Sequence, residues 1–135
     1  MLQVDGIVSK LFHLPSTPAP LDAVLRVHSR AYLERLEAAS LQGRSNLDAD
    51  TYLTEDSYQA ALLGAGGLLN VVDCVLQGKA QNGISLSRPP GHHATPAWGM
   101  GFCLLGNISI AARWAQDHYN VGRVLIVDFD VHHGN

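Results

Sequence analysis

The stretch VLIVDFDVHHGN at residues 124–135 decides the fold class predicted for this chain. Its first four residues form a continuous apolar run, which is typical of a parallel strand covered on both faces. A second, shorter strand is predicted at residues 83–87, and a helix over about residues 107–117 lies between the two. The order helix, strand, loop, helix and strand predicts an α/β fold in which crossover helices connect parallel strands.

Apolar residues with helical spacing also precede the first predicted strand. They run from residue 21 to about residue 39, with a break at His28 and Ser29, where Ser29 suits the N-cap of the second piece. The longest predicted helix covers residues 58–76, and Gly78 suits its end. Each glycine inside that helix costs about 1 kcal/mol of helix propensity. The helix contains Gly64, Gly66 and Gly67, and the presence of these glycines predicts that it packs closely against a neighbouring segment.

Composition fits a globular chain. The 135 residues include 9 basic and 12 acidic side chains, and 47% are apolar, which suits one domain or part of one. Residues 1–20, which are interrupted by prolines, are predicted to be an irregular leading segment. The basic residues are scattered and give no footprint for nucleic acid. We see no secretory signal, no stretch approaching the ~20 apolar residues of a membrane span and too few cysteines for a disulfide framework, so a cytoplasmic protein is expected.

Two pairs of adjacent histidines follow the two predicted strands, at residues 92–93 and 132–133. Ligands of open α/β sheets bind beyond the carboxyl ends of strands, so both pairs can converge on one edge of the sheet. Asp128 and Asp130 belong to the last strand, whose two-residue period points them and His132 to one side. Carboxylates in so apolar a strand are costly to bury unless a cation or a hydrogen-bonded histidine compensates them.

Asp130 and His132 form a mixed oxygen and nitrogen pair, which suits zinc, iron(II) or a similar divalent ion. A third protein ligand is required, and no residue of the sequence is well placed to supply it. A solvated loop pair is the structural alternative for Asp130 and His132, as buried or capping histidines are for His92 and His93. Finding both pairs and both aspartates in one chain favours a functional site. Cys103, which apolar residues flank, is expected to be a buried structural thiol.

Three motifs carry a family resemblance: RPPGHHA at residues 88–94, GFC at residues 101–103 and DFDVHHGN at residues 128–135. In order and spacing they resemble the histone deacetylase and acetylpolyamine amidohydrolase family, closest to its class II-like and bacterial branch. The resemblance covers about residues 20–135. It implies a parallel-sheet, three-layer arginase/deacetylase-like α/β fold, of which this chain represents only a part.

The resemblance also implies roles for the polar cluster. Asp130 and His132 correspond to zinc ligands, and His92 and His93 to the tandem catalytic histidines beside the metal-bound water. Asp128 corresponds to the buried aspartate that orients His92 and belongs to the catalytic group. The same resemblance implies a structural potassium ion bound through Asp128, Asp130 and His132.

Further positions correspond to supporting residues of the family. Gly101 and Phe102 resemble one wall of the acyl-lysine channel. Asp50 resembles a rim acid that holds the substrate backbone, and Asn135 stands where an Asp or Asn supports His93.

The implied activity is zinc-dependent hydrolysis of the acyl amide of acetyl-lysine in a protein or of an acetylated polyamine, with neither nucleic acid nor membrane as partner. In the family, zinc polarises the amide carbonyl and lowers the pKa of its bound water toward ~7. His93 is the candidate general base, and His92 would supply charge stabilisation or proton transfer. The family's third zinc ligand and its oxyanion-stabilising Tyr or His come after the last motif. We therefore expect this chain alone to be an inactive fragment of a full-length enzyme.

Two alternatives stay open. A degenerate member could be a non-catalytic module that binds acyl-lysine or polyamine, and the residues downstream of the last motif would discriminate it from the enzyme. An arginase-like ureohydrolase is disfavoured, because those enzymes prefer D-x-H-x-D and position 134 is Gly134.

Overall fold

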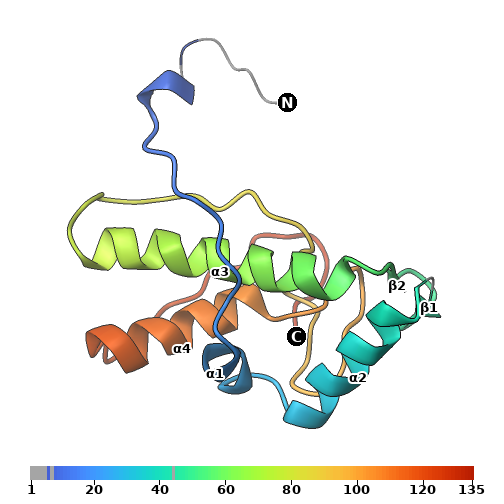
Figure 1. The fold of residues 1–135 in the computed structure, drawn as a ribbon. Coiled ribbons are helices and arrows are strands. Elements are labelled where there is room, and N and C mark those ends of the chain that lie inside the picture. Colours follow the sequence, from blue (N-terminus) through green and yellow to red (C-terminus); the bar gives the residue numbers. More distant parts are fainter. Residues whose placement is uncertain (1–5, 7, 44) are drawn as a thin grey trace.

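The computed structural model describes residue 6, residues 8–43 and residues 45–135. Its helices are, in chain order, η1 (Val8–Lys10), α1 (Leu21–Leu25), α2 (Arg30–Leu41), α3 (Ser57–Leu76) and α4 (Asn107–Tyr119). Helix α3 crosses the middle of the fold, α4 packs along it, and α1 and α2 pack against α4 and α3 respectively (Figure 1). Two short antiparallel strands, β1 (Ser45–Asn46) and β2 (Tyr52–Leu53), precede α3.

The ends of the helices follow from local caps. Ser29 accepts a hydrogen bond from the backbone N–H of Tyr32 at 3.2 Å, so the predicted break between α1 and α2 and the predicted cap are confirmed. Gly78 lies just beyond α3 with φ +71°, the left-handed conformation that commonly terminates helices. Helix α4 continues to residue 119, slightly beyond the predicted 117, and Asn120 ends it in the left-handed conformation.

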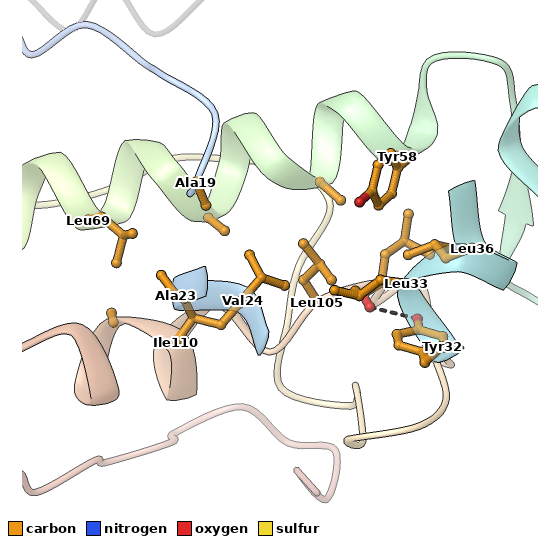
Figure 2. Close-up of a cluster of buried hydrophobic side chains, with 14 of the residues drawn as sticks. Ala19, Ala23, Val24, Tyr32, Leu33, Leu36, Tyr58, Leu69, Leu105 and Ile110 are labelled. Atoms are coloured by element: carbon orange, nitrogen blue, oxygen red, sulfur yellow. Dashed lines mark hydrogen bonds between the residues drawn. The ribbon is translucent and has the colours of Figure 1, made fainter. Parts of the chain in front are cut away.

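The hydrophobic core lies where the helices meet (Figure 2). Val24, Leu36 and Ile110 come from α1, α2 and α4 and are almost fully buried. Each such side chain contributes roughly 1.5–3 kcal/mol by its removal from water. Tyr32 belongs to the same core, and its hydroxyl donates to the carbonyl oxygen of Leu104 at 2.7 Å. The loop that carries residues 101–103 is therefore attached to the core at Leu104.

The glycines of α3 are in close contact with other segments, as predicted. A Cβ atom on Gly66 would overlap the Thr17 carbonyl oxygen and lie 2.5 Å from the backbone nitrogen of Ala19. That nitrogen donates to the carbonyl oxygen of Leu62 on α3 at 2.9 Å. Figure 1 shows the chain before α1 crossing directly over α3. Small residues here let two backbones approach closely.

The prediction of parallel strands at residues 83–87 and 124–127 is wrong for the described chain. Neither segment makes a backbone–backbone hydrogen bond within the described residues, and neither is a strand. The predicted burial of residues 124–127 is wrong too, because Leu125 is 87% and Val127 is 72% exposed. A β-strand needs a neighbouring strand for its hydrogen-bond ladder. The described chain provides no such neighbour for either segment.

Helix α3 corrects the expectation that no stretch approaches a membrane span. The helix has 20 residues and contains an 18-residue window with a mean hydropathy of 1.5, so by length and composition alone it could cross a membrane. In this fold the helix packs against α2 and α4. Its Asp73 accepts hydrogen bonds from Trp114 Nε1 at 2.6 Å and from the Tyr119 hydroxyl at 2.8 Å, both on α4. Its hydropathy therefore fits its place between other elements of the fold.

Candidate active site

The structure brings His92, His93 and the last segment of the chain together. The imidazole rings of His92 and His93 lie with their centroids 4.0 Å apart, and that of His132 lies 6.1 Å from the ring of His93. The backbone N–H of Asn135 donates to the His92 carbonyl oxygen at 2.7 Å, which ties the two segments together. The side chains of the predicted cluster thus share one small region, although no sheet of the described chain aligns them.

His92 and Asp128 form a hydrogen-bonded pair across 36 residues of sequence. His92 Nδ1 and Asp128 Oδ2 are 2.9 Å apart. This hydrogen bond, together with one from the backbone N–H of Asp130, holds the pKa of the Asp128 carboxyl below its usual value. An ionised Asp128 accepts from the protonated Nδ1, which leaves Nε2 as the free nitrogen of His92. Asp128 was expected to be buried, but its side chain is 41% exposed, because the described chain leaves the extended segment that carries it uncovered.

Asp130 and His132 form a second pair at the other end of the cluster. Asp130 Oδ1 lies 2.8 Å from His132 Nδ1 and accepts the backbone N–H of His132, also at 2.8 Å. These two bonds, the backbone bond first, lower the pKa of the Asp130 carboxyl. Both side chains are open to solvent. The carboxylate oxygen and the imidazole nitrogen of this pair thus face each other at hydrogen-bond distance.

The donor chemistry of Asp130 and His132 fits two positions of a zinc site, since zinc is bound by carboxylate oxygen and imidazole nitrogen. Among the described residues, no group of three or more His, Cys, Asp or Glu side chains is arranged to hold a metal ion. The described part of the chain therefore brings together one oxygen and one nitrogen donor, at Asp130 and His132, without a group of three.

Three other predicted residues lie near the cluster in different ways. The side-chain amide of Asn135 donates to the carbonyl oxygen of His93 at 2.7 Å, so it contacts the backbone of His93 rather than its ring. Gly101 lies directly against the His93 ring, where an added Cβ would sit 3.0 Å from His93 Cγ and overlap Cδ2. Asp50 is exposed on the loop between β1 and β2, and its backbone N–H donates to Asp48.

Phe102 borders a groove that the histidines do not share. The groove, of about 260 Å³, lies between the start of α3 and residues 88–90. A second hollow of about 220 Å³ has His92, Asp128 and Asn135 in its lining. Among the described residues, Phe102 and His92 therefore line two separate hollows, and the predicted channel wall stays a prediction.

Sequence reasoning missed two side chains that bind the backbone of Gly101 and Phe102. Asp48 Oδ2 accepts the backbone N–H of Gly101 at 3.1 Å, and Thr51 Oγ1 accepts that of Phe102 at 2.9 Å. The side chain of Thr51 and the backbone N–H groups of Asp50, Gly101 and Thr51 lower the pKa of the Asp48 carboxyl. An Asp followed by polar turn residues was the available signal, and it predicts a local turn but no distant partner.

Sequence reasoning also missed His28, whose side chain binds the backbone of Gly106, just before α4. Its side chain is 2% exposed, and its Nε2 accepts the backbone N–H of Gly106 at 2.9 Å. Burial lowers the pKa of His28, against the opposing effect of the backbone carbonyls of Thr95 and Pro96. A neutral imidazole therefore fixes the residue that precedes α4.

Cys103 agrees with its predicted structural role. The thiol is fully buried, and burial raises its pKa. Its sulfur accepts the backbone N–H of His93 at 3.4 Å, which links the GFC segment to the second histidine.

Residues 1–135 match the histone deacetylase domain family. A histone deacetylase-like amidohydrolase of Pseudomonas aeruginosa is 44% identical over 135 residues, which are all of this chain and 36% of the relative. A polyamine deacetylase of Danio rerio is 37% identical over 139 residues, covering 98% of this chain and 21% of that protein. The chain therefore spans about a third of the length of the first relative and a fifth of the second.

The fold has a close counterpart among solved structures. The crystal structure of the HDA15 HD domain superimposes with a TM-score of 0.86 at 38% sequence identity, over 90% of this chain and 34% of that chain. This likeness confirms the predicted deacetylase-like α/β fold class, present in part.

Proposed function

The chain belongs to the histone deacetylase family, and on that premise we propose that the protein carrying it hydrolyses the acyl amide of acetyl-lysine side chains or acetylated polyamines. The observation that supports this most is the meeting of two side-chain pairs beside His93. One pair, His92 with Asp128, is suited to proton chemistry, and the other, Asp130 with His132, is suited to a metal ion.

Asp130 and His132 are the residues that would hold zinc in this proposal. When bound, the metal would supply polarisation of the amide carbonyl and a more acidic water. The His132 ring lies 6.1 Å from the His93 ring, which supports a metal position close to the tandem histidines. A structural potassium ion on the segment containing Asp128, Asp130 and His132 stays a prediction.

His93 is the proposed general base, which takes the proton of the attacking water. His92 is the proposed partner that carries positive charge or passes a proton to the departing amine. The Asp128 carboxylate, 2.9 Å from Nδ1 of His92, fixes the tautomer and the orientation of the ring. The packing of Gly101 on the His93 ring fixes the plane of that ring.

The substrate side of the proposal rests on Gly101, Phe102 and Asp50. Phe102 is 53% exposed, so its ring is available to contact the methylene groups of a lysine or polyamine chain. Asp50 is exposed on the adjoining loop, where its carboxylate could accept hydrogen bonds from a substrate backbone.

A second candidate is a binding module of the same fold without turnover. It is favoured by one observation: the described residues provide two metal donors and no group of three. Such a protein would hold an acylated amine against Phe102 and the histidines and leave it intact.

The test uses the protein expressed from its complete reading frame. Hydrolysis of an acetyl-lysine peptide and of an N-acetylated polyamine is measured before chelation, after chelation and after zinc is restored. We expect turnover of at least one substrate, lost on chelation and regained with zinc. His93→Ala should keep the fold and the metal and lose most turnover, whereas Glu55→Gln, at an exposed position outside the cluster, should match the unaltered protein.

Two outcomes contradict the enzyme. Saturable binding of either probe without turnover by a folded, zinc-loaded protein would establish the binding module. Turnover that survives complete removal of metal would refute the zinc-dependent reaction.

A further inference from the structure

The turn at residues 100–103 has an unusual backbone. Gly101 and Phe102 are consecutive and both adopt positive φ, at +55° and +67°. Glycine enters this region freely, but a side chain such as that of Phe102 is sterically disfavoured there. The Phe102 ring is more than half exposed, so burial of its side chain does not compensate for this backbone. Something else must hold the turn.

The two side chains that hold it come from the loop before β2. The Asp48 carboxylate accepts the N–H of Gly101, and the Thr51 hydroxyl oxygen accepts the N–H of Phe102. Together the two bonds secure both left-handed residues from positions 53 and 51 residues earlier in the sequence.

Asp48 is itself rigidly placed. Its Oδ1 accepts the backbone N–H of Thr51 at 2.6 Å and that of Asp50 at 3.0 Å, and Thr51 is 2% exposed. The Thr51 carbonyl in turn accepts the N–H of Leu47 at 2.8 Å. An anchor with this many bonds can impose a conformation on the turn that it contacts.

The turn lies against a proposed catalytic residue. Gly101 is so close to the His93 ring that an added Cβ would overlap it. Cys103, two residues later, also contacts His93, because its sulfur accepts the backbone N–H of His93. A shift of the turn would therefore move the surface on which the His93 ring rests and, with it, the ring of Phe102.

We propose that Asp48 and Thr51 are positioning residues, which hold the Gly101–Phe102 turn in its left-handed conformation and thereby fix the channel wall relative to His93. The inference rests on the proposed deacylase function and goes beyond it in naming two residues that act through the hydrogen bonds they make to the turn. The same Asp48 carboxylate also fixes the backbone of Asp50. Wall and rim therefore depend on a single side chain.

The test compares four variants of the protein expressed from its complete reading frame. Asp48→Asn replaces one acceptor oxygen with a donor, and Thr51→Val removes the hydroxyl while keeping the shape. Thr51→Ser keeps the hydroxyl and is the conservative control, and Glu55→Gln is the control for loss of an acid nearby. For each variant, kcat and KM on an acetyl-lysine peptide, zinc content, melting temperature and amide hydrogen exchange at Gly101 and Phe102 are measured.

We expect Asp48→Asn and Thr51→Val to exchange both amides faster and to lose about 10- to 100-fold in kcat/KM, because small misplacements of reacting groups have effects of that size. Zinc content should stay at the level of the unaltered protein. Thr51→Ser should recover most of the kcat/KM that Thr51→Val loses, and Glu55→Gln should lose none. A merely structural role would lower the melting temperature and leave kcat/KM of the folded fraction unchanged.

Unchanged amide exchange in both Asp48→Asn and Thr51→Val would overturn the proposal, as would faster exchange with unaltered kcat/KM. If the unaltered protein hydrolyses neither acetylated probe, the proposed function fails separately. Amide exchange then still decides whether Asp48 and Thr51 hold the turn.

Discussion

The helices of this chain and its last segment, residues 122–135, are stabilised in different ways. Helices α3 and α4 satisfy their own backbone hydrogen bonds and bury one face of each against neighbours. Residues 124–127 have no backbone partner among the described residues and expose apolar side chains. Even so, residues 128–132 keep a defined local geometry, because the carboxylates of Asp128 and Asp130 each accept the backbone N–H two residues further on.

This difference indicates that residues 128–132 are ordered by their own hydrogen bonds, whereas residues 124–127 require a neighbouring segment to form a strand. The alternating pattern of Asp128, Asp130 and His132 builds its own turns, and the pairing of His92 with Asp128 attaches them to the rest of the fold.

The largest expected effect contrasts glycines in the two regions. Gly66→Ala should destabilise the protein by about 3 kcal/mol or more, since the added methyl would overlap the backbone of residues 17–19 and neither backbone can yield easily. Gly122→Ala, with open space around it, should stay within about 0.5 kcal/mol. Denaturant unfolding of both variants measures this. Equal losses would mean that the contact between α3 and residues 17–19 does not support the core.

The next effect tests how the last segment is attached to the histidines. Asp128→Asn and His92→Ala should each lower turnover, Asp128→Asn by about 10- to 100-fold, as expected for a residue that orients another. The double variant should be little worse than the poorer single variant, because both changes remove one functional unit. Kinetic measurements in a double-mutant cycle test this. Fully multiplicative losses with zinc retained would show that the two residues act independently.

A smaller effect concerns the exposed apolar run. Expressed alone, the chain of residues 1–135 should self-associate through residues 124–127, because exposed apolar segments without backbone partners favour aggregation. Replacing Leu125 and Val127 with serine should reduce this association in light scattering. Leu41→Ser, at a residue that is 74% exposed on α2, is the matched control and should change little. A sharp cooperative melt of a monomeric chain would contradict the expectation.

The smallest expected effect is the pH dependence that His28 contributes. Burial lowers its pKa in the folded state, so the unfolded chain binds more protons below the ordinary value of 6.5. Its contribution therefore destabilises the fold as pH falls below about 6.5 and vanishes above it. His28→Gln retains an acceptor for the Gly106 N–H. The free energy of unfolding of this variant should depend less on pH between about 7.5 and about 5, a range that includes the ordinary histidine pKa of about 6.5. An unchanged slope of stability against pH would show that groups other than His28 cause this pH dependence.

Sequence reasoning located the helices well because their signals are local. Ser29 and Gly78 mark helix ends by their own chemistry, and apolar spacing marks the buried faces. The motifs likewise pointed to five polar side chains that the structure brings together: His92, His93, Asp128, Asp130 and His132. Strands at residues 83–87 and 124–127 were wrong because strand formation depends on partners that no local pattern provides.

The contacts of the loop before β2 lay beyond sequence reasoning for a related reason. Asp48 and Thr51 meet Gly101 and Phe102 only through the fold, and the residues in between give no periodic signal of that contact. The family resemblance assigned Asp50 as a rim acid, whereas Asp48, two residues earlier, makes the hydrogen bonds that connect this loop to Gly101.

The central claim, that Asp130 and His132 bind a catalytic zinc while His93 acts beside it, is tested most directly by measuring zinc content together with turnover. In the protein expressed from its complete reading frame, Asp130→Ala and His132→Ala should each lose the metal and all measurable hydrolysis, because each removes one of the few protein ligands of a zinc site. His93→Ala should retain about one zinc per chain and lose most turnover. Full zinc occupancy in Asp130→Ala or His132→Ala, or full turnover in His93→Ala, would contradict the claim.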